Sequence, residues 1–458
     1  MVVPLEPGII NLYACGPTVY NYQHIGNLRT YIFEDLLVRT LKRAGFTVKH
    51  VMNITDVGHL VSDGDLGEDK MLVAAKKEGR NSEEVAQFYT DIFFNHCQKV
   101  NIIKPDIVCK ATEHIPQMIE LIKMLEEKDI AYLAGGNIYF DVSKSSDYGK
   151  LAQLDLDSLM SGARIEVDSN KRSPLDFVLW FTKSKFENQE LQWDSPWGRG
   201  YPGWHIECSA MSREYLGDEF DIHCGGIDHI PVHHTNEIAQ SQGATNKCPA
   251  KIWMHCNFLV LNSSESENQK MSKSTGEFLT LDLLETRQID PLAFRLFCLG
   301  TSYRSELSWS WQAAESAQRS LNKIRDQILQ LKEIPSSAAS ANQSYLDEFD
   351  EALFTDLGLP KALAVLHKLL GDSSLVASEK LETLMEFDQV LGLNLLATSQ
   401  EVVPDEIVEL AEQRLAAKKQ KNFIEADFLR NKILELGYLV EDNKDGFKLK
   451  ANRNSAKY

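Results

Sequence analysis

The stretch that decides the fold is IINLYACGPTVYNYQHIGNLRTYIFEDLLVRTLKRAGFTVKHVMNI, residues 9–54. Its apolar run at 9–14 predicts a buried strand, and apolar side chains then recur at helical spacing until Gly45 provides a stop. Residues 46–54 predict the next strand. These elements form a βαβ unit whose polar loop begins at Cys15, at the carboxyl end of the first strand, where doubly wound α/β sheets bind nucleotides.

Residues 220–226, FDIHCGG, predict a second strand edge of the same kind. Between the two edges, the patterns predict helices at 82–101 and 113–128 and short strands at 138–142 and 177–181. The sequence therefore predicts an α/β, Rossmann-type doubly wound parallel-sheet domain over residues 1–310. An inserted subdomain is expected at about 100–200.

The chain becomes helical after Trp311, and a polar linker, PSSAASANQS, follows at 335–344. We expect an α-helical bundle over 311–400. Residues 401–458 predict two helices and a β-hairpin, a small α/β module. Residues 411–458 contain eleven Lys and Arg and seven Asp and Glu. The net charge of this tail is therefore +4, and that of the rest of the chain is −22.

Composition narrows the class of protein. The 458 residues allow two to four domains. Neither an apolar stretch of about 18 residues nor a basic region followed by an apolar core is present, so we expect no membrane partner. The eight scattered cysteines predict free thiols or metal ligands in a reducing, cytoplasmic setting. A net charge of −18 argues against indiscriminate nucleic-acid binding, so a polyanion would be met by the basic tail.

Several residues are candidates for a metal site. His233 and Glu237 are four apart in a predicted helix and therefore share one face. Two thiolates, one imidazole and one carboxylate suit zinc in type and number, and the candidates for them are Cys15, Cys208, His233 and Glu237. A single cysteine is more often a small buried hydrophobe than a ligand. Spacing alone leaves other candidates open, namely His223, Cys224, His229 and His234.

The string HIGN at 24–27 is a candidate phosphate site. His24 and Asn27 lie between strand and helix, where free backbone N–H groups and the helix dipole attract phosphate. Gly26 lets a nucleotide approach the backbone closely. Alone, four such residues also occur by chance in loops.

The string KMSKS at 270–274 lies in a Ser-rich segment. Lys270 and Lys273 are suited to neutralising a triphosphate as pyrophosphate leaves. Composition alone equally fits a solvated Ser/Lys loop. The order of the two strings decides the interpretation, because HIGN precedes KMSKS by a long interval.

This pair resembles the signatures of the class I aminoacyl-tRNA synthetases, and more closely those of the cysteinyl-tRNA synthetase family. The resemblance also covers CGPTVYNYQHIGNLRTY, NITD at 53–56, GWHIECSAM at 203–211 and DIHCGGIDHIPVHHTNEIAQ at 221–240, in the family's order. It implies one zinc ion held by Cys15, Cys208, His233 and Glu237. It also implies an amino-acid pocket at Gly16, Thr55 and Trp204, and ATP contacts at His24, Gly26, Asn27, Asp228, Lys270, Ser272 and Lys273.

The resemblance implies ATP-dependent activation of L-cysteine and its transfer to tRNA(Cys), with Mg²⁺ accompanying ATP, by a monomer. His24, Asn27, Lys270 and Lys273 would act in catalysis, by position and charge rather than as nucleophiles. The chain departs from the family's usual pattern at Asn27, Cys224 and the 57–71 segment. One alternative is a ligase that joins cysteine to an amino sugar, but such enzymes lack a tRNA-reading tail. Another is a catalytically silent RNA-binding relative.

Overall fold

The computed structural model describes residues 2–57, 74, 79–154, 169–183, 190–261, 269–270, 279–335, 337–397, 404–443 and 446–451. The chain divides into two compact units. The first comprises residues 1–280, 298–310 and 350–363, and the second comprises 281–297, 311–349 and 364–458. This division differs from the predicted boundary at residue 310, because 281–297 belongs to the second unit and 350–363 to the first.

The first unit is built around a parallel sheet. In the described part of the chain its order is β3-β2-β1-β8-β9. The strands are β1 (Ile9–Ala14), β2 (Thr47–Ile54), β3 (Ile107–Lys110), β8 (Phe220–Gly226) and β9 (Ala250–Cys256). Each pairs in parallel with its neighbours, and the chain order reverses between β1 and β8. The predicted parallel, Rossmann-like sheet is confirmed.

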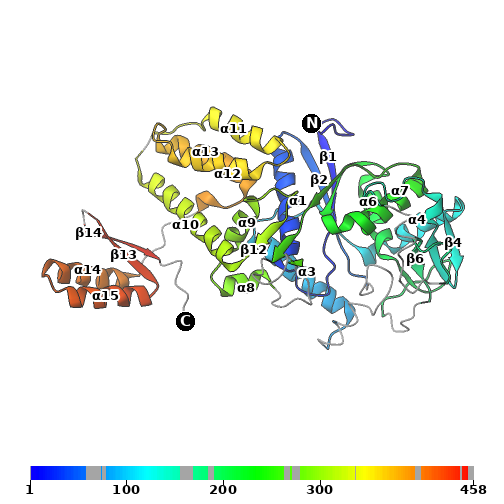
Figure 1. The fold of residues 1–458 in the computed structure, drawn as a ribbon, viewed down its shortest axis with the longest axis horizontal. Coiled ribbons are helices and arrows are strands. Elements are labelled where there is room, and N and C mark those ends of the chain that lie inside the picture. The colour runs from blue at the N-terminus through cyan, green and yellow to red at the C-terminus, as the bar shows by residue number, and fades with distance from the viewer. Residues whose placement is uncertain are drawn as a thin grey trace. The chain divides into compact units, whose positions relative to one another are not determined.

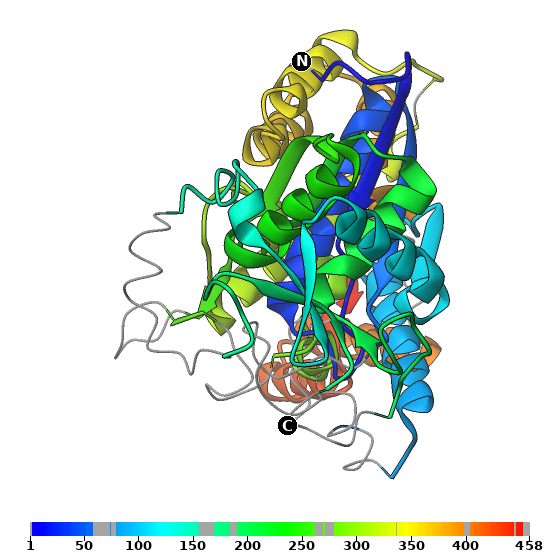
Figure 2. The ribbon, with the colours of Figure 1, turned by 90° about the vertical axis from the view of Figure 1, so that its right-hand side faces the viewer.

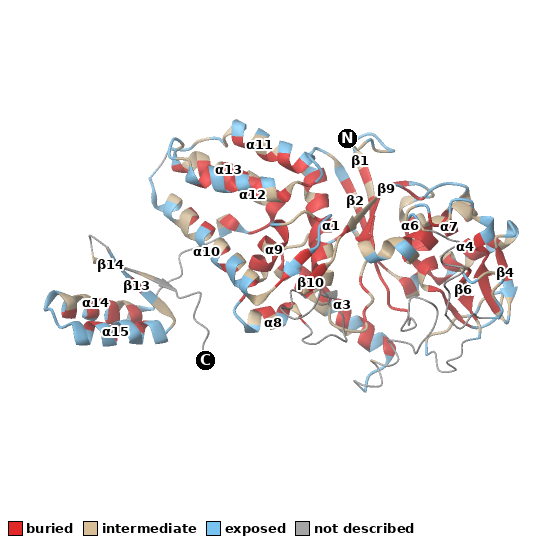
Figure 3. Cartoon of the chain, in the orientation of Figure 1, coloured by how far each residue is buried: buried red, intermediate tan, exposed pale blue. Residues whose placement is uncertain are grey.

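Helices cover both faces of this sheet. Helix α1 (Ile25–Arg43) connects β1 to β2, and α6 (Trp204–Leu216) lies on the opposite side of these strands (Figure 1). Parallel strands between two layers of helices are buried on both faces, so burial alternates little along them. Strand β8 is buried along its whole length. Figure 3 shows red along much of β1 and β2. The next α-helix after α6 is α7 (Thr235–Thr245), which comes after β8 in the chain and is green in Figure 2.

A separate antiparallel sheet has the order β4-β5-β6-β7. Its strands are β4 (Ala131–Ala134), β5 (Asn137–Phe140), β6 (Phe177–Phe181) and β7 (Tyr201–Pro202). The short strands predicted at 138–142 and 177–181 lie at β5 and β6. Strand β3, within the expected 100–200 range, pairs with β2 in the parallel sheet. Helix α4 (Ile115–Glu127) also packs with the main core, against α6 and α7. Helix α3 (Ser82–Lys99) occupies the predicted 82–101 segment.

A third sheet of the first unit flanks the KMSKS segment. It contains β10 (Leu259–Leu261), β11 (Gln269–Lys270) and β12 (Leu307–Trp309) in the order β11-β10-β12. The buried Arg29 of α1 donates to the carbonyl oxygens of Asn257 and Phe258 at the start of β10. The backbone N–H of Ile25 donates to the carbonyl of Leu279, 2.9 Å away. These bonds join the first turns of α1 to both flanks of the segment 262–278.

The second unit is mainly helical. Its elements include α8 (Leu281–Thr286), α9 (Pro291–Leu299), α10 (Trp311–Glu333) and α13 (Ala377–Leu391). Helices α11 (Gln343–Phe354) and α12 (Leu359–Gly371) are shared between the units. Helix α10 buries Leu321, Ile324 and Ile328, as its helical periodicity predicts. None of the helices that the structure describes combines the length and apolar character needed to cross a membrane.

The chain's last described elements are a helical pair and a hairpin. They are α14 (Asp405–Lys419), α15 (Phe423–Glu435), β13 (Tyr438–Asn443) and β14 (Gly446–Ala451). Their small core contains Leu410, Leu429, Ile433 and Val440. The inner faces of α14 and α15 are buried and their outer faces exposed (Figure 3). Residues 405–451, named here the C-terminal module, match the two helices and hairpin that the sequence predicts.

Candidate active site

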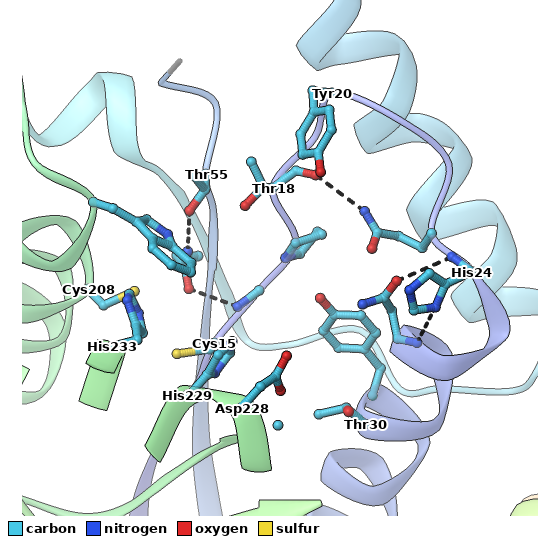
Figure 4. A pocket seen from close by; sticks show the side chains of 18 of the residues that line it. Cys15, Thr18, Tyr20, His24, Thr30, Thr55, Cys208, Asp228, His229 and His233 are labelled. Atoms are coloured by element: carbon cyan, nitrogen blue, oxygen red, sulfur yellow. Dashed lines mark hydrogen bonds between the residues drawn. The ribbon is translucent and has the colours of Figure 1, made fainter. Parts of the chain in front are cut away.

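A cavity of about 270 Å³ lies where β1, β2 and β8 end. Strand ends at the point of order reversal are the usual ligand site of open α/β sheets, because loops on either side diverge there. The cavity is lined by Cys15, Gly16, Pro17, Thr18, Tyr20, Tyr22, Gln23, His24, Asn27, Thr30, Tyr31, Asn53, Thr55, Trp204, Cys208, Gly226, Asp228, His229 and His233. Figure 4 shows Thr55, Cys208 and His233 on one side and His24 on the other.

Four candidate metal ligands meet at this cavity. Cys15 follows β1, Cys208 lies in α6, His233 in a short π-helical turn (Ile230–His234) and Glu237 in α7. Their ligand atoms all lie within 4.8 Å of one another, and every side chain is buried. The predicted helix at His233 and Glu237 begins with this π-helical turn, yet the two residues still share a face, with Nε2 and Oε1 3.1 Å apart.

Neighbouring histidines hold the ligands. His223 Nε2 lies 3.0 Å from the Glu237 Oε2 atom. His205 Nδ1 lies 2.9 Å from His233 Nδ1, so the other ring nitrogen of His233 faces the cluster. Such outer hydrogen bonds fix the orientation of ligands around protein-bound metals. The arrangement therefore has the features of a preorganised metal site.

A second set overlaps the first. Cys15, His223, His234 and Glu237 also have ligand atoms within 4.8 Å of one another. In this set His234 Nε2 lies 3.3 Å from Cys15 Sγ and its Nδ1 lies 2.8 Å from His255 Nε2. The first set has two sulfur ligands and lines the cavity through three members, whereas only Cys15 of the second set does. Access to the cavity favours the first set for a metal that contacts a substrate.

The electrostatics of the cluster suit a cation. The Cys15 hydrogen bond lowers the pKa of Cys208 to about 7, against the effect of burial. Burial lowers the pKa of His233, but Glu237 and Cys208 outweigh it and raise that pKa to about 10. Burial alone would raise the pKa of Glu237, yet the facing histidines His223 and His233 hold it well below its usual range. Protons therefore occupy positions for which a metal ion would compete.

The HIGN residues form a helix cap. His24 is the N-cap of α1, and its Nδ1 accepts from the backbone N–H of Asn27, 3.1 Å away. Asn27 Oδ1 accepts from the His24 backbone N–H at 3.3 Å, which completes a capping box. Both residues line the cavity, but Gly26 does not. A Cβ at Gly26 would meet the His24 ring at 3.0 Å, so glycine allows the cap to close.

The predicted amino-acid and nucleotide contacts share this cavity. Gly16, Thr55, Trp204 and Asp228 all line it. A Cβ at Gly16 would lie 1.6 Å from the carbonyl oxygen of Asn53, so no other residue fits there. The backbone of Lys270 lies in β11, paired with Val260. The predicted contacts at Ser272 and Lys273, and the side chain of Lys270, lie outside what the structure describes.

Sequence reasoning missed several polar residues of the site. Asn53 lines the cavity, and the buried Glu207 accepts a hydrogen bond from Thr55. His205, which the sequence analysis also did not name, contacts His233. His223, one of the alternatives that spacing left open, lies against Glu237. A usable signal was present, because Asn53 and Glu207 stand inside the quoted NITD and GWHIECSAM strings.

The sheet topology places the cavity where doubly wound α/β sheets bind nucleotides, and comparison with known proteins gives the class of the domain. The family model "tRNA synthetases class I (C) catalytic domain" matches residues 1–319. A solved methionyl-tRNA synthetase from Mycobacterium tuberculosis, bound by methionyl-adenylate, has a similar fold, with a TM-score of 0.55 and 15% identity over 84% of this chain and 90% of that one. The chain therefore has the catalytic domain of a class I aminoacyl-tRNA synthetase.

Relatives over nearly the full length narrow the class. The chain is 48% identical to "Cysteine--tRNA ligase" of Treponema denticola, covering 96% of this chain and 95% of the relative. It is 44% identical to "Cysteine--tRNA ligase 1" of Burkholderia lata, covering 97% and 93%. The chain belongs to the cysteine–tRNA ligase family. The predicted ligase class is confirmed, and the amino-sugar ligase is not favoured.

Proposed function

We propose that this chain activates L-cysteine with ATP and transfers it to tRNA(Cys), with one zinc ion bound by Cys15, Cys208, His233 and Glu237. The observation that carries the proposal is the meeting of these four ligand atoms within 4.8 Å beside a cavity that also contains the HIGN cap. Family membership supports the reaction. The donor set supports the metal, because two thiolates with an imidazole and a carboxylate suit tetrahedral zinc.

Activation proceeds by attack of the substrate carboxylate on the α-phosphorus of ATP, which releases pyrophosphate and leaves cysteinyl-adenylate. His24 and Asn27, at the positive end of α1, would hold the phosphates. Lys270, Ser272 and Lys273 would neutralise the charge that develops on the leaving pyrophosphate, with Mg²⁺ on the ATP phosphates. Asp228 would contact the adenosine. Positioning, rather than a protein nucleophile, is the source of catalysis.

Selectivity would come from the metal site. Zinc bound there would favour the substrate thiolate over the hard, weakly acidic hydroxyl of serine. Gly16, Thr55 and Trp204 would surround the rest of the amino acid. A site built around one polar contact can reject an analogue that lacks it by about 10⁴- to 10⁵-fold. A separate editing site would then be unnecessary.

The second step joins the cysteinyl group to the terminal hydroxyl of the tRNA and releases AMP. We propose that residues 401–458 contact the anticodon region, that 311–400 form a bundle domain and that residues near 131–202 form the inserted subdomain. The net charge of +4 on residues 411–458 supports the first of these assignments. The eight free thiols fit a reducing, cytoplasmic compartment. We propose, as the resemblance implies, that the enzyme is a monomer.

Pyrophosphate exchange with each of the twenty amino acids tests the proposal. We expect exchange with cysteine only, followed by charging of transcribed tRNA(Cys). Exchange with cysteine but transfer only to an amino sugar would support the rival ligase. Absence of exchange with cysteine would support a silent RNA-binding relative.

A further inference from the structure

Thr55 lies at the wall of the cavity with its backbone held on both sides. Its N–H donates to the carbonyl of Pro17 at 3.0 Å, and its own carbonyl accepts from Val19 at 3.2 Å. The residue is only 2% exposed, yet it lines the cavity. Because the backbone is fixed, only the hydroxyl group of Thr55 can rotate. Neighbouring side chains therefore determine the direction in which it points.

Two buried side chains form hydrogen bonds with the Thr55 hydroxyl. It donates to Glu207 Oε2 at 3.3 Å and accepts from Asn53 Nδ2 at 3.0 Å. A hydroxyl has one proton and two lone pairs, so these contacts leave one lone pair and no donor. Asn53 is itself fixed, because its Oδ1 accepts from the Gly16 backbone N–H at 2.9 Å. The hydroxyl can therefore accept one further hydrogen bond and cannot donate one.

Negative charge lies behind this hydroxyl. Glu207 is fully buried in α6, and Asp56, beside Thr55, is 6% exposed. Asp56 accepts from the backbone N–H and the hydroxyl of Thr112, at 2.9 and 2.7 Å. Burial raises the pKa of Asp56, the hydrogen bonds from Thr112 lower it, and the charge of Glu207 adds to the rise. A cation on the cavity side of Thr55 would be attracted.

We propose that Glu207 and Asn53 are positioning residues that fix the Thr55 hydroxyl as an acceptor for the ammonium group of bound cysteine. The inference rests on the proposed function and deepens it, because it assigns recognition of the substrate amine to residues that do not bind the thiol. A hydrogen-bond acceptor at the same place would find the hydroxyl proton already used, and a neutral donor would gain no attraction from the carboxylate. The cavity thereby selects an α-amino thiol from among thiols.

Binding of three thiols to the full-length, zinc-loaded chain tests this, with isothermal titration calorimetry as the measurement. Cysteine has an amine and a carboxylate, cysteamine has the amine alone, and 3-mercaptopropionate has the carboxylate alone. We expect Thr55→Val and Glu207→Gln each to weaken cysteine and cysteamine about tenfold or more, the loss of a hydrogen bond to a charged group. Binding of 3-mercaptopropionate should stay within about twofold or tighten.

Conservative variants distinguish a positioning role of these residues from a general disruption of the pocket. Thr55→Ser keeps the hydroxyl and should restore cysteine binding to within about threefold of the parent chain. Glu207→Asp keeps the charge but retracts it, so the amine-bearing ligands should again weaken selectively. It also replaces Glu207→Gln if that chain does not fold. Equal weakening of all three ligands, or of none, would overturn the inference. Failure of the parent chain to bind any of the thiols would instead refute the proposed function.

Discussion

The cluster of four candidate metal ligands buries its polar groups, whereas the C-terminal module exposes most of its own. Cys15, Cys208, His233 and Glu237 are each at most 4% exposed, so their polar atoms have lost water. The module has a small apolar core and exposes most of its charges and several large apolar side chains. Buried polar groups lower stability unless they are fully partnered, whereas exposed ones cost little. The cluster's arrangement is therefore explained by binding, and a single substitution there should have a much larger effect.

The largest expected effect is that of Cys208→Ser. A hydroxyl replaces one of two thiolates, so zinc should be lost and cysteine-dependent pyrophosphate exchange should fall by more than about 10³-fold. Metal analysis and the exchange assay measure both. Cys97→Ser changes another buried thiol, in α3 and outside the cluster, and should retain zinc. Full metal occupancy and activity in Cys208→Ser would remove it from the ligand set.

His223→Gln tests the contact behind the cluster. His223 Nε2 lies 3.0 Å from Glu237 Oε2, and outer-shell losses of this kind lower metal affinity about 10- to 100-fold. Competition with a chromophoric chelator measures the affinity. His50→Gln, at a buried histidine of β2, is the control and should leave zinc affinity unchanged. Unchanged affinity in His223→Gln would mean that Glu237 is held by its other contacts.

In the C-terminal module, Phe428→Ala tests whether an exposed side chain contributes to tRNA binding. Phe428 is 63% exposed on α15, near Ile424 at 87%, on the face opposite the core. If this face stacks with unpaired anticodon bases, the KM for tRNA should rise about tenfold, since one base stack contributes about 1–3 kcal/mol. Pyrophosphate exchange should not change. Phe354→Ala, at a 51% exposed phenylalanine outside the module, is the matched control. Equal KM values in both variants would exclude this face from tRNA binding.

The smallest effect is expected for Asp442→Asn. Arg414, with Lys418, holds the pKa of Asp442 below its usual range. The stabilisation is therefore present above the unfolded carboxyl pKa of about 3.9 and is lost as the pH falls toward the folded pKa. Since Asp442 is 40% exposed, we expect a loss of only about 0.5–1 kcal/mol at pH 7.

Hydrogen exchange of residues 405–451, followed between pH 7 and pH 3, measures this effect. The parent chain should lose protection on acidification, whereas Asp442→Asn should start lower and change less. Glu435→Gln, at an exposed carboxylate of α15, should behave like the parent chain. An identical response of the parent chain and Asp442→Asn would show that the ion pair does not stabilise the module.

Local sequence patterns predicted the strands and helices that carry the site. Contacts between residues far apart in the sequence could not be predicted in this way. The β1–α1–β2 unit could be predicted because each element shows its own periodicity over residues 9–54. The pairing of β3 with β2 could not be predicted, because β3 is only four residues long and the pairing is not local. The contact between Thr55 and Glu207 spans 152 residues, so no local pattern indicates it. Likewise, the π-helical turn before α7 has no periodicity of its own.

We propose that the buried cluster binds zinc through two sulfur atoms and then receives the sulfur of the substrate. X-ray absorption at the zinc edge, on the full-length chain with and without L-cysteine, tests it most directly. We predict one zinc per chain with two sulfur neighbours, rising to three when cysteine is added, and no such rise with serine. A chain without zinc, or a sulfur count that cysteine does not change, would contradict the account.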